Sequence, residues 1–116
     1  EKETSTLAGR MQLILQSLQE QETPFEYTIT GLDLGNVRCE ILAKNLAVNT
    51  TLKSIHIARK GINESSGLSL AKMLNTNQTL RKMELEGNLM GPKSATEFGK
   101  ALRNNSTLRF LDLESN

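Results

Sequence analysis

The sequence predicts an α/β solenoid: a right-handed superhelix with parallel strands on its concave face and helices on its convex face. The first observation is self-similarity at a fixed interval of 28 residues, the distance from Leu52 to Leu80. The second is that the apolar spacing inside each interval changes from the alternation of a strand to the spacing of a helix. The third is an aromatic content of only 3%, with no Trp, which fits a core of stacked aliphatic layers. A unit this short buries its apolar face only by stacking on its neighbours.

Residues 5–20 are predicted to form an amphipathic helix that ends before Pro24. Its apolar residues fall on one side of the helix: Leu7, Met11, Ile14, Leu15 and Leu18. The end of a stack of repeats needs a cover over its open edge. We therefore assign residues 1–23 to an N-terminal capping helix, with the last helix of a preceding unit as the alternative.

The first repeat, residues 24–51, is irregular. Keeping the 28-residue interval places its strand at residues 25–29, with Tyr27 and Ile29 facing inward. The alternative places the strand at residues 29–34 and shortens the following loop by five residues. We favour the first register because Leu34 then aligns with Ile62 and Met90 without a gap.

The second and third repeats, residues 52–79 and 80–107, align without a gap, and residues 108–116 begin a fourth. Each is expected to open with a strand whose inward residues alternate: Leu52, Ile55 and Ile57, then Leu80, Met83 and Leu85, then Leu108, Leu111 and Leu113. The helices that follow should bury Leu70, Ala71 and Leu74 in one repeat and Phe98, Gly99 and Leu102 in the next.

The turns on either side of each helix carry their own signals. Ser94 and Glu97 predict a capping box at the start of the third helix, with Pro92 lying just before it. An Asn-x-Thr phrase recurs before each new strand, where its side chains can bond the backbone: Asn49 and Thr51, Asn77 and Thr79, Asn105 and Thr107.

This phrasing resembles the leucine-rich-repeat superfamily, in particular its ribonuclease-inhibitor-like class. The family phrase LxxLxLxxN is matched at two places: Leu80, Met83, Leu85 and Asn88, then Leu108, Leu111, Leu113 and Asn116. The resemblance implies that the phrase Asn bonds backbone groups of adjacent coils. Lys60 stands at that place in the second repeat, so we expect a looser, solvent-facing turn there.

Composition narrows the function classes. The 116 residues suffice for one domain, and the net charge of +1 argues against a dedicated nucleic-acid or membrane binder. The single cysteine, Cys39, excludes an internal disulfide and favours a reducing, cytoplasmic setting. The charged start of the chain is unlike a signal peptide, and the lack of an initiator Met leads us to expect a longer protein.

The concave face is the predicted protein-binding surface, since outward strand residues of neighbouring repeats form columns about 4.8 Å apart. Its candidate residues are Ser54, His56, Lys82, Glu84, Glu86, Phe110, Asp112 and Glu114. One column reads Thr28, His56, Glu84 and Asp112. Four carboxylates lie together at one end of the face, those of Glu84, Glu86, Asp112 and Glu114. They repel each other, and a bound cation would relieve this repulsion. A basic line of Lys53, Arg81 and Arg109 precedes the strands, and Phe110 is the apolar anchor.

No catalytic, cofactor or metal site is predicted from the motifs. Cys39 aligns with the small residues Gly67 and Ala95, which favours a packing role over a nucleophile. The chain contains no Gly-rich phosphate loop and no ligand spacing typical of zinc.

The leading functional prediction is therefore a non-catalytic protein–protein interaction module. The repeat phrasing at residues 48–58, 70–88 and 108–116 resembles the tropomodulin and leiomodin family, which implies actin-filament pointed-end binding as one alternative. The repeats of intracellular innate-immune sensors are phrased nearly as closely. A GTPase-activating protein of the same fold is the alternative from another class, with Arg59 and Lys60 as the basic pair in a suitable loop.

Overall fold

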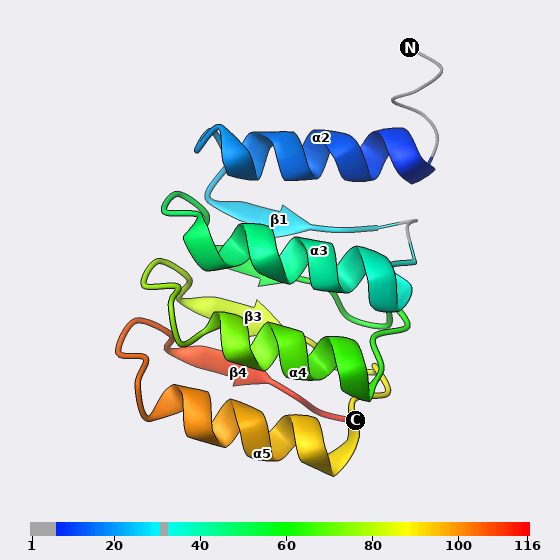
Figure 1. Ribbon diagram of the computed structural model, residues 1–116, viewed down its shortest axis with the longest axis vertical. Helices are drawn as coiled ribbons and strands as arrows, with labels where there is room; N and C mark the ends of the chain where they lie inside the picture. The colour runs from blue at the N-terminus through cyan, green and yellow to red at the C-terminus, as the bar shows by residue number, and fades with distance from the viewer. Residues whose placement is uncertain (1–6, 31–32) are drawn as a thin grey trace.

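The computed structural model describes residues 7–30 and 33–116, with only the backbone of Leu7 and Ala8. The described residues form a four-stranded parallel sheet in the order β1-β2-β3-β4 and a layer of helices. The strands are β1 (Glu26–Thr28), β2 (Ser54–His56), β3 (Lys82–Glu84) and β4 (Phe110–Asp112). The helices are α2 (Leu7–Gln19), α3 (Gly35–Val48), α4 (Glu64–Met73) and α5 (Gly91–Leu102). Figure 1 shows strands and helices alternating along the long axis, which confirms the predicted α/β solenoid.

The register of the first repeat follows the 28-residue interval. Tyr27 pairs with Ile55, which pairs with Met83, which pairs with Leu111. The alternative register is wrong, because β1 ends at Thr28 and the described residues of the alternative segment, 29–30 and 33–34, are not in a strand. Leu34, Ile62 and Met90 occupy equivalent buried places at the start of the helices, as the ungapped alignment predicted.

Helix α2 occupies the position of a repeat helix. It packs on α3, with Met11 and Leu18 buried and Ile14 and Leu15 partly buried against the core. The carbonyl of Leu18 accepts a hydrogen bond from the Asn49 side chain at 2.9 Å, just as the carbonyl of Leu46 accepts one from Asn77 at 2.8 Å. Helix α2 therefore makes the same contact with the turn that follows it as the repeat helix α3 does. Residues 1–6 of the predicted segment lie outside the described residues.

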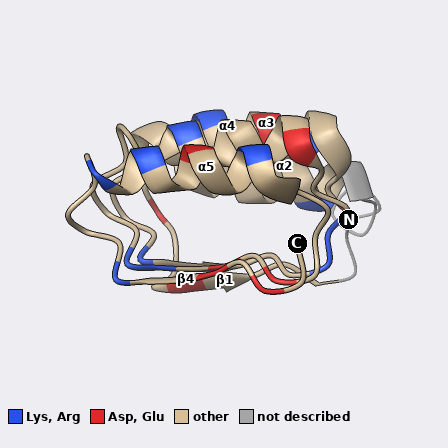
Figure 2. Ribbon diagram, turned by 90° about the horizontal axis from the view of Figure 1, so that it is seen from below, with Lys and Arg blue, Asp and Glu red and all other residues tan. Residues whose placement is uncertain are grey.

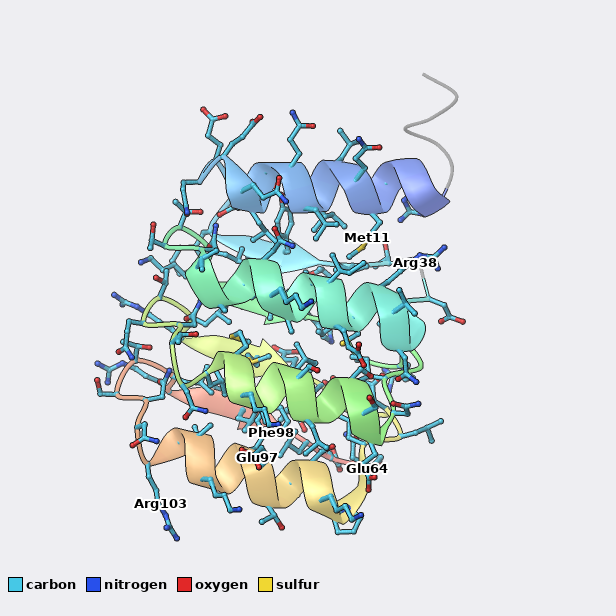
Figure 3. The ribbon with its side chains drawn as sticks, viewed as in Figure 1. Met11, Arg38, Glu64, Glu97, Phe98 and Arg103 are labelled. Carbon is cyan, nitrogen blue, oxygen red and sulfur yellow. The ribbon has the colours of Figure 1, made fainter. Side chains whose placement is uncertain are left out.

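The core fills the space between the strand and helix layers. All six predicted inward strand residues of the second and third repeats are fully buried: Leu52, Ile55, Ile57, Leu80, Met83 and Leu85. Figure 3 shows Met11 and Phe98 among the side chains near this interior, and Arg103 pointing away from the end of α5. The predicted stripe on α5 is wrong at Gly99 and Leu102, which are exposed because no further described helix packs on that side.

The start of α5 also differs from its prediction. The helix begins at Gly91, three residues before Ser94, so Pro92 lies in its first turn, where its missing N–H costs nothing. Ser94 is buried inside the helix and donates to the carbonyl of Glu64 at 3.1 Å, which ties α5 to α4. The capping box instead begins α4, where the Asn63 side chain accepts from the Ser66 amide and Ser66 accepts from the Asn63 amide.

At the edge where helices lead into strands, the recurring Asn residues are buried and fully bonded. Asn77 donates to the carbonyl of Leu46 in the preceding repeat and accepts from the amides of Thr79 and Leu80 in its own. Asn105 makes the same pattern one repeat later, with the carbonyl of Leu74. Backbone bonding therefore accounts for this phrase, as predicted from the sequence.

At the opposite edge, where strands lead into helices, Asn88 bonds across two repeats. Its carbonyl oxygen accepts from the amides of Lys60 (2.8 Å) and Ile62 (3.2 Å), and its amide donates to the carbonyls of Ile57 and Leu85. Asn116 likewise accepts from the Met90 amide at 3.2 Å.

The expectation of a looser turn at Lys60 is wrong. The backbone carbonyl of Lys60 accepts from the amide of Leu34 at 3.0 Å and that of Gly35 at 3.2 Å. Leu34 is equivalent to Ile62 and Met90, whose amides donate to the side chains of Asn88 and Asn116. For the amide of Leu34, the main-chain oxygen of Lys60 is the acceptor instead. A second reason is that Asn88 of the next repeat holds the Lys60 amide itself.

Candidate functional site

The concave face is formed by the outward residues of the four strands. The predicted column is confirmed by the register, in which His56 lies between Thr28 and Glu84, and Glu84 lies between His56 and Asp112. Figure 2 shows this strand layer beneath the helices, with basic segments gathered where the strands begin. These segments include Lys53, Arg81 and Arg109, whose backbones continue the ladder: Arg81 donates to Lys53 and Arg109 donates to Arg81.

One of the predicted face residues is not accessible. Ser54 is buried, with 4% of its surface exposed, although it points to the same side as His56. Its register partners are Glu26 and Lys82, and a short hydroxyl between two longer side chains is shielded from solvent. Ser54 is therefore a correction to the predicted contact set.

Lys82 connects the charged and apolar parts of the face. Its ammonium lies 2.8 Å from Glu84 Oε1 and 5.2 Å from the ring centroid of Phe110 on the neighbouring strand. The hydrogen bond that Lys82 donates to Glu84, followed by the charge of that carboxylate, raises the pKa of Lys82. Phe110 is 49% exposed, so its ring presents an apolar surface beside a fixed cation.

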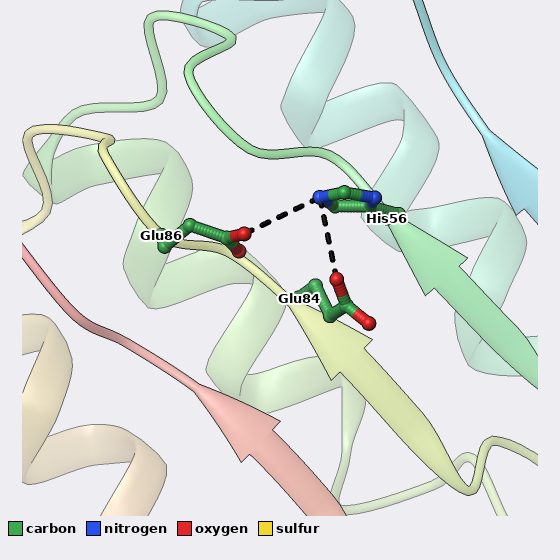
Figure 4. Close-up of side chains that lie close together, drawn as sticks. All are labelled: His56, Glu84 and Glu86. Atoms are coloured by element: carbon green, nitrogen blue, oxygen red, sulfur yellow. Dashed lines mark ion pairs between the residues drawn. The ribbon is translucent and has the colours of Figure 1, made fainter.

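His56, Glu84 and Glu86 converge on one point of the face. His56 Nε2 lies 3.3 Å from Glu84 Oε2 and 3.4 Å from Glu86 Oε2 (Figure 4). All three side chains are partly buried. The sequence placed His56 beside Glu84 in one column but did not predict that Glu86 meets the same imidazole nitrogen. The signal was the 28-residue register, which sets His56 beside Glu84, with Glu86 two residues further along the same chain segment.

The remaining predicted residues, Asp112 and Glu114, lie at the β4 end of the face. Asp112 is partly buried and accepts a hydrogen bond from the Glu114 amide at 2.9 Å, while Glu114 is exposed. A hollow beside His56 at the other end of the face is lined by Thr28, Ile29, Thr30, His56, Ala58, Arg59 and Lys60. The acidic cluster thus sits between an apolar ring on β4 and a polar hollow on β1 and β2.

Cys39 has the packing role predicted for it. It is fully buried in the helix layer, and this burial raises the pKa of its thiol to about 12. A thiol held in its protonated form is a poor nucleophile. The equivalent glycine, Gly67, leaves no room for a larger residue, since an added Cβ would lie 2.5 Å from Ser94 Oγ.

The convex face carries exposed Lys44, Lys72 and Lys100 at equivalent places on the helices. Sequence reasoning did not identify the exposed apolar residues of α3, among them Val37 and Val48 at 71% and 69% exposure. No helix among the described residues is long and apolar enough to cross a bilayer.

Several solved structures resemble this chain, among them one from leiomodin and one from tropomodulin. Leiomodin-1 actin-binding site 2 has a TM-score of 0.63 at 19% sequence identity, covering 85% of this chain and 76% of that one. The tropomodulin C-terminal domain of Caenorhabditis elegans has a TM-score of 0.60 at 14% identity, covering 89% and 81%. Searches with family models and against curated proteins found no match. At such identities the likeness shows the fold alone, which is that of leucine-rich-repeat domains.

Proposed function

We propose that this chain is a non-catalytic protein-binding module whose partner docks on the concave face. The observation that carries the proposal is the half-exposed Phe110 ring beside Lys82, flanked by the cluster of His56, Glu84 and Glu86. An apolar anchor within a ring of charged groups is the usual arrangement at the centre of a protein interface. The face suits a partner segment that brings one apolar side chain and basic residues.

Actin is the first partner to test. The support is the shared fold with a leiomodin-1 domain described as an actin-binding site. The assay is elongation of pyrene-labelled actin from filaments whose barbed ends are blocked, with this protein added in increasing amounts. Slower pointed-end elongation is the expected result. An unchanged elongation rate would remove actin as the partner and leave the concave face to be tested with another protein.

The docking face is tested separately with matched surface variants. Replacing Glu84, Glu86, Asp112 and Glu114 together by Ala should weaken binding of the captured partner by at least about tenfold. The matched control replaces Lys44, Lys72 and Lys100 by Ala on the convex face, where we expect binding to be retained. Circular dichroism of both variants verifies the fold. Equal binding by the two variants would reject the concave face.

Phe110→Ala separates the anchor from the charges. We expect a loss of about tenfold or more in affinity, because removing a central aromatic side chain typically costs over 1 kcal/mol. Val48→Ala, at an exposed apolar residue of α3, is the control.

The GTPase-activating alternative rests only on the Arg59–Lys60 pair, and unaccelerated GTP hydrolysis by small GTPases would dispose of it.

A further inference from the structure

We propose that the concave face holds one divalent transition-metal ion of the zinc class. Its ligands are His56 Nε2, one carboxylate oxygen of Glu84 and one of Glu86. The ligand atoms all lie within 4.8 Å of one another. This proposal does not depend on which protein docks on the face, since all three ligands belong to this chain.

The distances fit a tetrahedral ion. Zinc binds imidazole nitrogen and carboxylate oxygen at about 2.0–2.2 Å, so two ligand atoms of a tetrahedron lie about 3.3–3.5 Å apart. His56 Nε2 lies at 3.3 Å from Glu84 Oε2 and 3.4 Å from Glu86 Oε2. Two edges of the tetrahedron therefore exist already, and closing the third requires only a small movement of two glutamate side chains (Figure 4).

Two atoms of this cluster lack hydrogen-bond partners among the described residues, and one of them is the imidazole nitrogen that faces both carboxylates. His56 Nε2 and Glu86 Oε1 are shielded from solvent, and neither makes a hydrogen bond there. A buried polar atom without a partner costs free energy, and such atoms call for an explanation. The imidazole nitrogen faces two carboxylate oxygens at 3.3 and 3.4 Å, which is also the spacing that ligands of one bound ion would have.

Lys82 orients one of the ligands. Its ammonium holds Glu84 Oε1 at 2.8 Å, which turns the other oxygen, Oε2, toward His56. Groups that hold a ligand from outside the coordination sphere fix its geometry in metal sites generally. The charge also balances, because a neutral imidazole and two carboxylates together offset a divalent cation.

The donor set selects the class of ion. Calcium and magnesium prefer oxygen donors throughout, whereas an imidazole with two carboxylates suits zinc and neighbouring first-row metals. Three protein ligands leave the fourth position of a tetrahedral ion for water or for a donor from a docked protein. The neighbouring strand adds Asp112 next to Glu84, but its Oδ1 already accepts from the Glu114 amide.

The first test is isothermal titration of untagged protein with zinc chloride in a buffer containing excess magnesium. One saturable site is expected. His56→Ala and Glu86→Gln should each weaken it by about 100-fold or more, since even residues outside the coordination sphere cost 10–100-fold. Glu114→Gln, at an exposed carboxylate of the same face, is the matched control and should bind as the parent does. Equal zinc affinity in the parent, His56→Ala and Glu86→Gln would overturn the proposal.

The second test reads the imidazole itself. His56 is the single histidine of the chain, so its side-chain nitrogen signals are unambiguous in an NMR spectrum. Zinc should shift the Nε2 resonance in a one-to-one titration, and a chelator should reverse the shift. An unshifted Nε2 at saturating zinc would show that the triad is instead a simple ion pair between imidazolium and carboxylates, and would overturn the metal site. The thiol of Cys39 is fully buried in the helix layer, away from the concave face, so we expect no signal from it in this titration.

Discussion

The two edges of the solenoid both use Asn side chains in their turns, but within the repeats only one edge has another residue in place of Asn. Where helices lead into strands, Asn occupies the equivalent place in each repeat, as Asn49, Asn77 and Asn105, and each is at least 91% buried. Where strands lead into helices, the equivalent residue is Asn88 in the third repeat and Asn116 in the fourth. In the second repeat it is Lys60. The difference shows which hydrogen bonds a main-chain carbonyl can take over and which need the side chain.

The explanation lies in what each side chain bonds. At the helix-to-strand edge, the Asn77 carbonyl oxygen accepts from two amides of its own turn, those of Thr79 and Leu80. At the strand-to-helix edge, the amide of Leu34 is satisfied by the carbonyl of Lys60 instead of a side chain. A position whose task the backbone can perform is free to vary in sequence.

Asn88→Ala is expected to have the largest effect on stability. The change leaves the amides of Lys60 and Ile62 and the carbonyl of Ile57 without the hydrogen bonds of Asn88. Buried groups left without partners cost about 1–3 kcal/mol each. Local relaxation and entering water will reduce the sum, so we expect a loss of about 3 kcal/mol in urea denaturation. A loss below about 1 kcal/mol would contradict the idea that this Asn closes the preceding repeat.

Asn77→Ala should destabilise the fold by about 2 kcal/mol. It frees the amides of Thr79 and Leu80 within one turn, while the carbonyl of Leu46 keeps its hydrogen bond from the Asn49 amide. The contact of Asn77 with the Asn49 carbonyl is already long at 3.4 Å. Amide hydrogen exchange at Thr79 and Leu80 would locate the damage. Faster exchange confined to the other edge would show that the assignment of these bonds is wrong.

Asn63→Ala should cost about 1 kcal/mol, the usual value for loss of a helix N-cap. Its carbonyl oxygen accepts from the amides of Ser65 and Ser66 in the first turn of α4, so the effect stays inside one repeat. Asn63→Asp is the matched control, because Asp caps a helix equally well. Equal destabilisation by both substitutions would show that capping is not the cause.

Lys60→Ala should change the free energy of unfolding by less than about 0.5 kcal/mol. Only backbone atoms of Lys60 take part in the turn, and an alanine keeps both of them. The result is compared with Asn88→Ala in the same denaturation experiment. A loss as large as that of Asn88→Ala would mean that the Lys60 side chain, and not its carbonyl, holds the turn.

The fold could be predicted well from the sequence because the same 28-residue interval recurs in successive repeats, and each recurrence indicates the same strand register. The strand of the first repeat could be placed without a gap only at the interval shared by the later repeats, and Tyr27 does pair with Ile55. Helix starts were harder to predict. Ser94 has the sequence of a cap but donates to Glu64 of the neighbouring helix, a contact that no local pattern encodes.

The candidate site was only partly predictable. Alternation along the strands identified which residues point outward, and the columns followed from the register. Burial of Ser54 was missed because it depends on the length of the neighbouring side chains. The convergence of His56 with Glu84 and Glu86 depends on rotamers across two strands, so a search for ligands close together along the chain does not find it.

The hydrogen bonds of both edges run from one repeat back to the one before it. Asn88 holds amides of the second repeat, Asn116 holds the amide of Met90, and Asn105 holds the carbonyl of Leu74. During synthesis on the ribosome, a repeat therefore leaves the exit tunnel with polar groups that only the next repeat can satisfy. The stability of each repeat consequently depends on the repeat that follows it in the chain.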